Sequence, residues 1–141
     1  DHVVRHGEAL LKLPPHIHPA VVRAYIEGAL VNDLDSADLE RLIEPWLSAE
    51  GHRSFYQQFA QADEKYTAEI EPSFGAVRCP VKIIWGREDP WIPLERGAAL
   101  HSLIHHASFK TLANVGHLPQ LEAPSVVLKE IVDFLLGDRA D

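Results

Sequence analysis

Residues 79–93 read CPVKIIWGREDPWIP, and this stretch decides the fold class of the chain. Its first part, Val81–Trp85, is rich in β-branched residues and stops at Gly86, which is typical of a short buried strand. The segment Leu94–Ile104 then predicts a helix that begins directly after Pro93. A strand followed by a loop and a helix is the start of a parallel α/β arrangement.

The same order of elements follows a second time toward the C-terminus. Ser108–Leu112 alternates like a second strand, and Gly137 ends a final helix. The buried stripe of that helix is predicted to consist of Val127, Ile131, Phe134 and Leu135. Strand, helix, strand and helix in this order imply two parallel strands with crossover helices. Since parallel strands usually need more than two neighbours, we expect an incomplete α/β domain.

The first half of the chain is helical in pattern, and nothing in residues 1–74 predicts a strand. Pro19 suits the first turn of a helix that extends to about Asn32. Asp35 or Ser36 can cap a second helix. Apolar residues recur at helical spacing further on, and we expect a core of aromatic side chains here. Its members are Trp46, Phe55, Phe59, Tyr66 and Phe74.

The composition permits a folded domain and excludes several classes of partner. The chain has 141 residues, with 13 Lys and Arg against 21 Asp and Glu, and therefore a formal charge of −8. No basic excess is available to neutralise phosphates, which argues against nucleic acid and against an anionic membrane surface as partner. No apolar run reaches the roughly 20 residues that span a bilayer.

The chain has one cysteine and no methionine. A single cysteine excludes a disulfide framework within the chain, and Cys79, which precedes a proline at a strand entrance, is expected to be buried and structural. The absence of even an initiator Met indicates a processed chain or a piece of something longer. The charged opening residues lack the pattern of a signal peptide, so we expect a cytoplasmic location.

Two loops carry the residues with the clearest chemistry. Each follows a predicted strand at its carboxyl end, where open α/β sheets place their ligands. The first loop, Gly86–Pro93, contains Asp89, and the second, Asn114–Pro124, contains His117. Carried on neighbouring strand ends, the two side chains can lie within hydrogen-bond reach. The carboxylate would orient the imidazole, whose other nitrogen is then free to act as a general base and acid.

The spacing of these loops resembles that of the α/β-hydrolase family. Residues 86–93 match G-x-x-D-x-x-x-P and residues 116–124 match G-H-x-x-x-x-E-x-P, within a similarity that covers about 58 residues, Cys79–Leu136. The resemblance implies that Asp89 is the catalytic acid and His117 the catalytic base, in the family's order of nucleophile, acid and His. The fold expected from it is the C-terminal part of an α/β-hydrolase sheet.

The resemblance also implies a division of the chain into two parts. Residues 1–78 are similar in helical character and position to the cap of such enzymes, and residues 79–141 to the end of their core. Trp91 and Leu118 flank the two catalytic positions. They are expected to bind the substrate, or else to fill the core.

The family's nucleophile is absent from the sequence. A G-x-S-x-G elbow belongs upstream of the acid, and the nearest approach, Glu71–Gly75, lacks the first Gly and follows no strand. The resemblance therefore implies a hydrolase of a small, largely apolar substrate whose nucleophile lies outside this chain, and the chain alone is expected to be inactive. Ester, C–C, halide and epoxide substrates stay open, and no metal or organic cofactor is implied.

Plainer interpretations stand beside these roles. Asp89 also suits a turn before Pro90, and Glu88 is a rival acid. The histidine pairs lack the supporting Cys, Asp or Glu that a zinc site needs. These pairs are His16 with His18 and His105 with His106.

A rival function from another class is a non-catalytic fragment that serves as a binding or assembly module. Its partner surface would be the unpaired strand edge at Val81–Trp85. A further alternative is a split hydrolase, in which a complementary chain supplies the nucleophile or a second copy covers the exposed edge.

Overall fold

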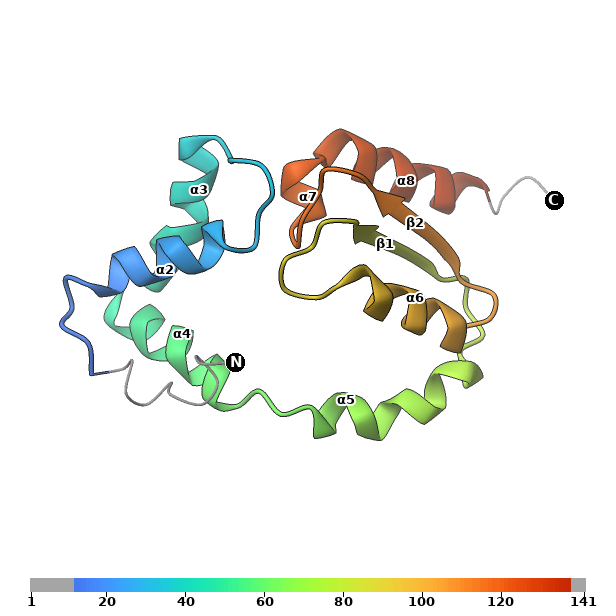
Figure 1. Ribbon diagram of the computed structural model, residues 1–141, viewed down its shortest axis with the longest axis horizontal. Helices are drawn as coiled ribbons and strands as arrows, with labels where there is room; N and C mark the ends of the chain where they lie inside the picture. The colour runs from blue at the N-terminus through green and yellow to red at the C-terminus, as the bar shows by residue number, and fades with distance from the viewer. Residues whose placement is uncertain (1–11, 138–141) are drawn as a thin grey trace. The chain divides into compact units, whose positions relative to one another are not determined.

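The computed structural model describes residues 12–137 (Figure 1). Its contacts divide the chain into two compact units. One unit contains the residues up to Gly28 together with Asp35–Glu69, and the other contains Ala29–Leu34 together with the residues from Ile70 onward. The segment Ala29–Leu34 therefore belongs to the second unit, although its neighbours on both sides in the sequence belong to the first.

The first unit is helical, and no strand occurs in its described part. The side chain of Asp35 accepts from Ala37 N–H and caps a helix, and Ser48 caps the next by accepting from Gly51 N–H. The elements are α2 (His18–Glu27), α3 (Ser36–Ile43), the 3₁₀ turn η1 (Glu44–Trp46), α4 (Ala49–Ala60) and α5 (Lys65–Ile70). The expected extension of α2 to Asn32 is wrong, because the helix ends at Glu27, with Gly28 as its cap, and the N–H groups of Val31 and Asn32 donate to Glu122 instead of continuing the helix.

Aromatic side chains form the core of the first unit, as the sequence predicted for most of them. Tyr56 and Phe55 are fully buried, and the rings of Trp46 and Phe59 each meet Phe55 edge to face. Tyr66 does not join them: it is 60% exposed, because α5 follows a break after α4 and buries no side chain.

The second unit contains the predicted pair of parallel strands. Its elements are η2 (Glu71–Ala76), β1 (Lys82–Gly86), α6 (Leu94–Leu103), β2 (Ser108–Leu112), α7 (Pro119–Glu122) and α8 (Pro124–Gly137). The strands pair in parallel, with Ile83 opposite Phe109 and Gly86 opposite Leu112. The expected fold class is thereby confirmed: two parallel strands with crossover helices, an incomplete α/β domain.

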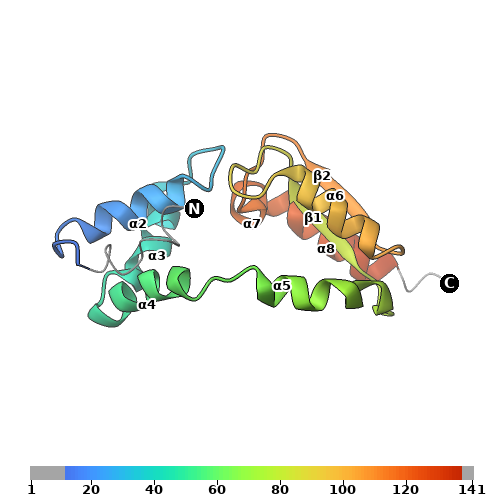
Figure 2. The same ribbon diagram turned by 60° about the horizontal axis from the view of Figure 1, so that its bottom comes forward.

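Helices α6 and α8 cover opposite faces of this sheet (Figures 1 and 2). Ile83, on one face, packs with Ile104 at the end of α6. Leu112, on the other face, packs with Val127 of α8. This division follows from the alternation of side chains along a strand. Because the two strands are parallel, their carboxyl ends and the loops that follow lie at the same edge of the sheet.

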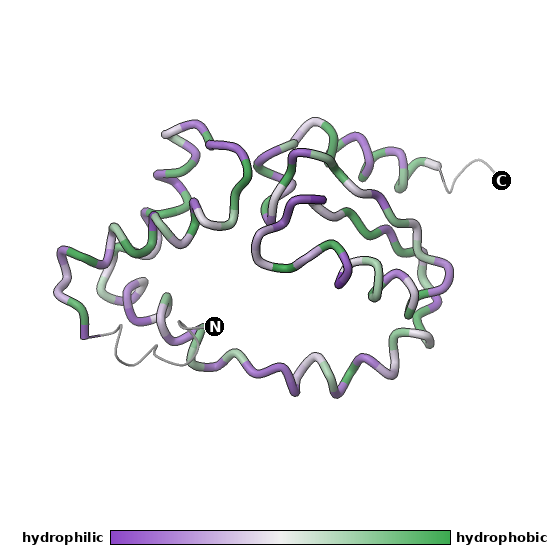
Figure 3. Tube along the Cα trace, viewed as in Figure 1, coloured by the Kyte–Doolittle hydropathy of each residue, from purple (hydrophilic) through white to green (hydrophobic). Residues whose placement is uncertain are grey.

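The stripe predicted for α8 is only partly buried. Hydrophobic residues recur along the whole helix (Figure 3), but of the four predicted positions only Val127 is buried, and Phe134 is half-buried. Ile131 is 43% and Leu135 is 61% exposed. Two strands about 5 Å apart offer a narrow face, so a helix of 14 residues extends beyond the surface that they can cover.

Two further expectations about burial are wrong. Phe74 packs against the cluster of Ile83, Ile104 and Ala107 in the second unit and not in a cap core. Cys79 is exposed, because the strand begins only at Lys82 and leaves the preceding residues in irregular chain. Among residues 12–137, no helix is both long enough and apolar enough to cross a membrane.

Candidate active site

The loop after β1 holds Asp89 in a fixed orientation. One carboxylate oxygen, Oδ1, accepts from the N–H groups of Trp91 at 2.8 Å and Ile92 at 2.9 Å. Aspartate side chains commonly stabilise turns by accepting from the N–H groups that follow them, so Asp89 is a turn residue, as the plainer interpretation expected. The turn uses only Oδ1, and the other oxygen, Oδ2, stays available for a second partner.

The loop after β2 approaches the first loop backbone to backbone. A Cβ on Gly86 would lie 2.0 Å from the carbonyl oxygen of Gly116 and 2.4 Å from that of Val115. Only glycine fits at such a distance. Asn114, with a φ of 57°, turns the chain just before this contact. The close approach brings the side chain of His117 over the first loop.

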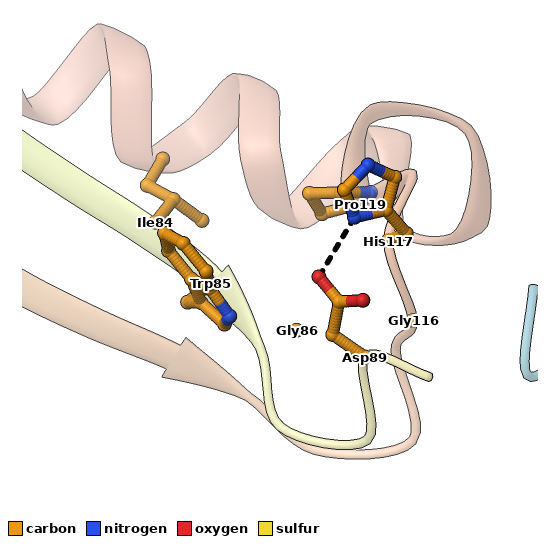
Figure 4. Close-up of a pocket in the computed structure, with 7 residues that line it drawn as sticks. All are labelled: Ile84, Trp85, Gly86, Asp89, Gly116, His117 and Pro119. Atoms are coloured by element: carbon orange, nitrogen blue, oxygen red, sulfur yellow. Dashed lines mark hydrogen bonds and ion pairs between the residues drawn. The ribbon is translucent and has the colours of Figure 1, made fainter. Parts of the chain in front are cut away.

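Asp89 and His117 are in direct contact. Nδ1 of His117 lies 2.9 Å from Oδ2 of Asp89 (Figure 4), and only 5% of the Asp89 side chain is exposed. Burial alone would raise the pKa of Asp89, but the hydrogen bonds from Ile92 N–H, from His117 and from Trp91 N–H outweigh it and lower that pKa. Asp89 is therefore a carboxylate at neutral pH.

An ionised Asp89 can accept a hydrogen bond but cannot donate one, so Nδ1 of His117 carries the proton. In the neutral imidazole the lone pair then lies on Nε2, which has no hydrogen-bond partner among residues 12–137. A nitrogen of this kind can take a proton from a neighbouring group, and the carboxylate stabilises the imidazolium that results.

A cavity of about 140 Å³ lies beside the pair. Asp89 and His117 belong to its wall, and none of the lining side chains carries a hydroxyl or a thiol. The lining residues are Ile84, Trp85, Gly86, Asp89, Gly116, His117 and Pro119 (Figure 4). The cavity can therefore accept a reacting group, but its walls do not supply a nucleophile.

Trp91 and Leu118 flank the pair differently. The ring of Trp91 packs against the imidazole of His117, with centroids 4.9 Å apart. Leu118 is half-buried and immediately precedes α7. Neither residue is among those that line the cavity. Substrate binding by the two side chains stays a prediction.

The rival residues have other partners. The Glu88 carboxylate accepts from Val115 N–H at 3.3 Å, and Ser73 lies in a 3₁₀ helix, where its hydroxyl donates to Ile70 O. His18 is buried in the helical unit, bonded to Tyr56 and to a backbone carbonyl, whereas His16 is exposed. Asp89 is the carboxylate that hydrogen-bonds to His117.

Glu122 is a residue of this region that sequence reasoning left without a role. Its carboxylate accepts from the N–H groups of Gly116, Val31 and Asn32. The sequence signal that could have pointed to Glu122 is its place as the Glu of the G-H-x-x-x-x-E-x-P motif. No pattern in the sequence connects it with Val31 or Asn32, because these residues lie some 90 positions away.

Comparisons with known proteins agree on one family. No family model matches the chain. A 2-hydroxy-6-oxononadienedioate/2-hydroxy-6-oxononatrienedioate hydrolase of Paraburkholderia xenovorans is 28% identical over 108 residues, which is 77% of this chain and 36% of that protein. Monoacylglycerol lipase ABHD6 of Mus musculus is 31% identical over 86 residues, 60% of this chain and 26% of the lipase.

Solved structures match over nearly the whole chain. An α/β hydrolase fold protein from Burkholderia ambifaria superposes with a TM-score of 0.87 and 36% identity, covering 94% of this chain and 49% of that one. A meta-cleavage product hydrolase, CumD, has the same fold, with a TM-score of 0.71, 18% identity and coverage of 84% and 46%. The chain thus spans about a third of its curated relatives and about half of these structures.

Proposed function

The chain belongs to the α/β-hydrolase family as part of its domain, and we propose that it contributes the acid and the base of a nucleophile–His–Asp triad. The observation that carries this proposal is the 2.9 Å contact between Nδ1 of His117 and Oδ2 of Asp89. It leaves Nε2 of the imidazole as the nitrogen that faces the reaction.

In the proposed mechanism Nε2 of His117 takes the proton of the nucleophile as that group attacks the substrate. Asp89 keeps the imidazole in the required tautomer and stabilises its positive charge. His117 then returns the proton to the leaving group or takes one from water. The nucleophile comes from outside the described residues, since the cavity beside the pair is lined by no hydroxyl or thiol. For the same reason we expect the 141-residue chain alone to be inactive.

The other parts of the chain receive roles that follow from this proposal. Residues 1–78 form the cap segment, of which Ala29–Leu34 and the stretch from Ile70 pack within the second unit, and residues 79–141 form the end of the hydrolase core. Trp91, whose ring packs at a tilt against His117, and Leu118 contact the substrate. Between residue 12 and Gly75 the structure contains helices and no strand, which fits a cap better than a core. The cytoplasmic location stays a prediction.

The substrate is proposed to be small and largely apolar. The relatives named above are a 2-hydroxy-6-oxononadienedioate/2-hydroxy-6-oxononatrienedioate hydrolase and a monoacylglycerol lipase, and neither is named for a halide or an epoxide. This favours an ester or a C–C bond over a halide or an epoxide for the present chain.

A hybrid enzyme tests the proposal. Residues 1–141 replace the matching half of the Burkholderia ambifaria protein, and hydrolysis of p-nitrophenyl butyrate is measured. We expect turnover in the hybrid and a loss of about 10³-fold or more in kcat on His117→Ala or Asp89→Asn. His105→Ala is the matched control, because His105 is exposed, and should stay within about twofold.

Two results would contradict the proposal. One is a His117→Ala hybrid that remains as active as the parent. The other is ester turnover by the 141-residue chain alone that depends on His117, since a nucleophile within the chain would then be required. An inactive hybrid, together with tight binding of the chain to another protein, would instead support the binding-module alternative.

A further inference from the structure

A single carboxylate gathers three backbone N–H groups beside the proposed base. Oε1 of Glu122 accepts from Gly116 N–H at 2.9 Å. Oε2 accepts from Val31 N–H at 2.9 Å and from Asn32 N–H at 3.1 Å. Hydrogen bonds to a charged acceptor are about twice as strong as neutral ones. Glu122 therefore connects the His117 loop with a segment near the start of the chain.

One further hydrogen bond, made by the backbone of His117 itself, connects the same two segments. The N–H of His117 donates to the carbonyl oxygen of Ala29 at 2.9 Å, and Ala29 is only 1% exposed. Ala29 precedes Val31 by two residues, so the carboxylate that holds Val31 also holds the acceptor of His117. The chain on both sides of the Gly116–His117 peptide is thus fixed, directly or indirectly, by Glu122.

The packing around these hydrogen bonds leaves little freedom. A Cβ on Gly116 would lie 2.8 Å from Ala29 O and 2.9 Å from Glu122 Oε1. Asn32 adds a further bond, since its side-chain amide donates to Asn114 O at 2.6 Å. The segment Ala29–Leu34 is accordingly bonded to the loop after β2 by side chains and backbone together.

We propose that Glu122 is a positioning residue for the base, acting through the main chain of His117. This inference rests on the proposed function of His117 and Asp89. Asp89 is held separately, by the N–H groups of Trp91 and Ile92. Loss of the Glu122 carboxylate therefore displaces the imidazole and not the aspartate, and weakens the 2.9 Å bond between them.

The experiment uses the 141-residue chain with Glu122→Gln. A carboxamide offers one acceptor oxygen, so one side of the bridge loses its partner and the amide NH₂ group faces an N–H donor. We expect amide exchange at Gly116, or at Val31 and Asn32, to accelerate by about tenfold or more. The Nδ1 proton resonance of His117, hydrogen-bonded in the parent chain, should broaden or disappear.

Two internal controls separate positioning from general destabilisation. The amides of Trp91 and Ile92 should keep their protection in Glu122→Gln, since they bond to Asp89. Glu95→Gln makes the same change of charge at an exposed position in the same unit and should leave all these signals unchanged. Should Glu122→Gln fail to fold, Glu122→Asp, which keeps the charge but is one methylene shorter, gives the same readouts.

The outcomes distinguish this inference from the function beneath it. A Nδ1 proton signal of His117 that Glu122→Gln leaves unchanged overturns the role of Glu122 alone, even if amide exchange accelerates. A parent chain in which His117 shows no Nδ1 proton bonded to Asp89 overturns the proposed pair, and the positioning role with it.

Discussion

Nδ1 of His117 lies 2.9 Å from Oδ2 of Asp89, although the two residues are 28 positions apart in the sequence. They stand on loops that follow different strands, and the backbone contact between Gly86 and Gly116 brings those loops together. With 26% of the His117 side chain and 5% of the Asp89 side chain exposed, the bond is largely shielded from water. The pair should therefore contribute to stability as well as to chemistry.

Asp89→Asn should lower the free energy of unfolding at pH 7 by about 1–3 kcal/mol. The folded-state pKa of Asp89 is lowered, because its three hydrogen bonds outweigh the effect of burial. A lowered pKa stabilises the fold above the unfolded-state value of about 3.9, and this contribution is lost as the pH falls through the folded-state value. The difference between parent and variant should thus shrink below about pH 4.

Urea unfolding followed by tryptophan fluorescence between pH 7 and pH 3 measures this difference. Asp133→Asn, at an exposed position of α8, is the control for the change of charge. A difference between parent and Asp89→Asn that stays constant down to pH 3 would contradict the assigned cause.

Gly86→Ala should destabilise the second unit by about 2–3 kcal/mol or more. The added Cβ would lie 2.0 Å from Gly116 O, and that backbone atom cannot move without moving the His117 loop. Gly137→Ala is the matched control, because nothing lies within 4 Å of a Cβ there. The urea midpoints of the two variants are compared, and Gly86→Ala should have the lower one. Equal midpoints would show that the loops do not depend on this contact.

The order and type of the core elements could be predicted because each follows from local patterns. The β-branched run before Gly86 predicts a strand within one residue of its observed bounds, and Ser108–Leu112 agrees at both ends. The pairing of Asp89 with His117 could be expected because parallel strands place the loops at their carboxyl ends side by side. Both results depend on the sequence near the residues concerned.

Burial was harder to predict, because it depends on which surfaces are present to cover a side chain. Leu135 is apolar at the correct helical spacing, yet it is 61% exposed beside a sheet of two strands. Phe74 continues a helical spacing but packs on the sheet. The bond between Val31 and Glu122 spans 91 positions, and no local pattern reports a contact of that range.

Trp91→Ala should weaken substrate binding more than it slows the chemical step. The side chain packs at a tilt against His117, but the bond that orients Asp89 comes from the backbone N–H of Trp91, which the variant keeps. In the hybrid enzyme we expect KM to rise about tenfold, as for the loss of about 1.4 kcal/mol, with kcat within about threefold. Trp91→Phe should recover part of the loss. A fall in kcat with an unchanged KM would contradict substrate contact by this ring.

The helical unit should lose stability as the pH falls below about 6.5. His52 stacks on the buried His18, with ring centroids 4.1 Å apart, and its Nε2 is buried without a hydrogen-bond partner in the described residues. Burial, and then the charge of His18, lower the pKa of His52. The unfolded chain therefore binds a proton more readily than the folded chain, which makes acid favour unfolding.

Urea unfolding followed by far-UV circular dichroism at pH 8 and at pH 5 should show a lower midpoint at pH 5. His52→Phe keeps an aromatic ring against His18 but cannot be protonated, so it should reduce the difference between the two midpoints. His16→Ala is the matched control: it removes an exposed histidine of the same unit and should leave that difference unchanged. A pH dependence that His52→Phe leaves intact would assign the effect to another group.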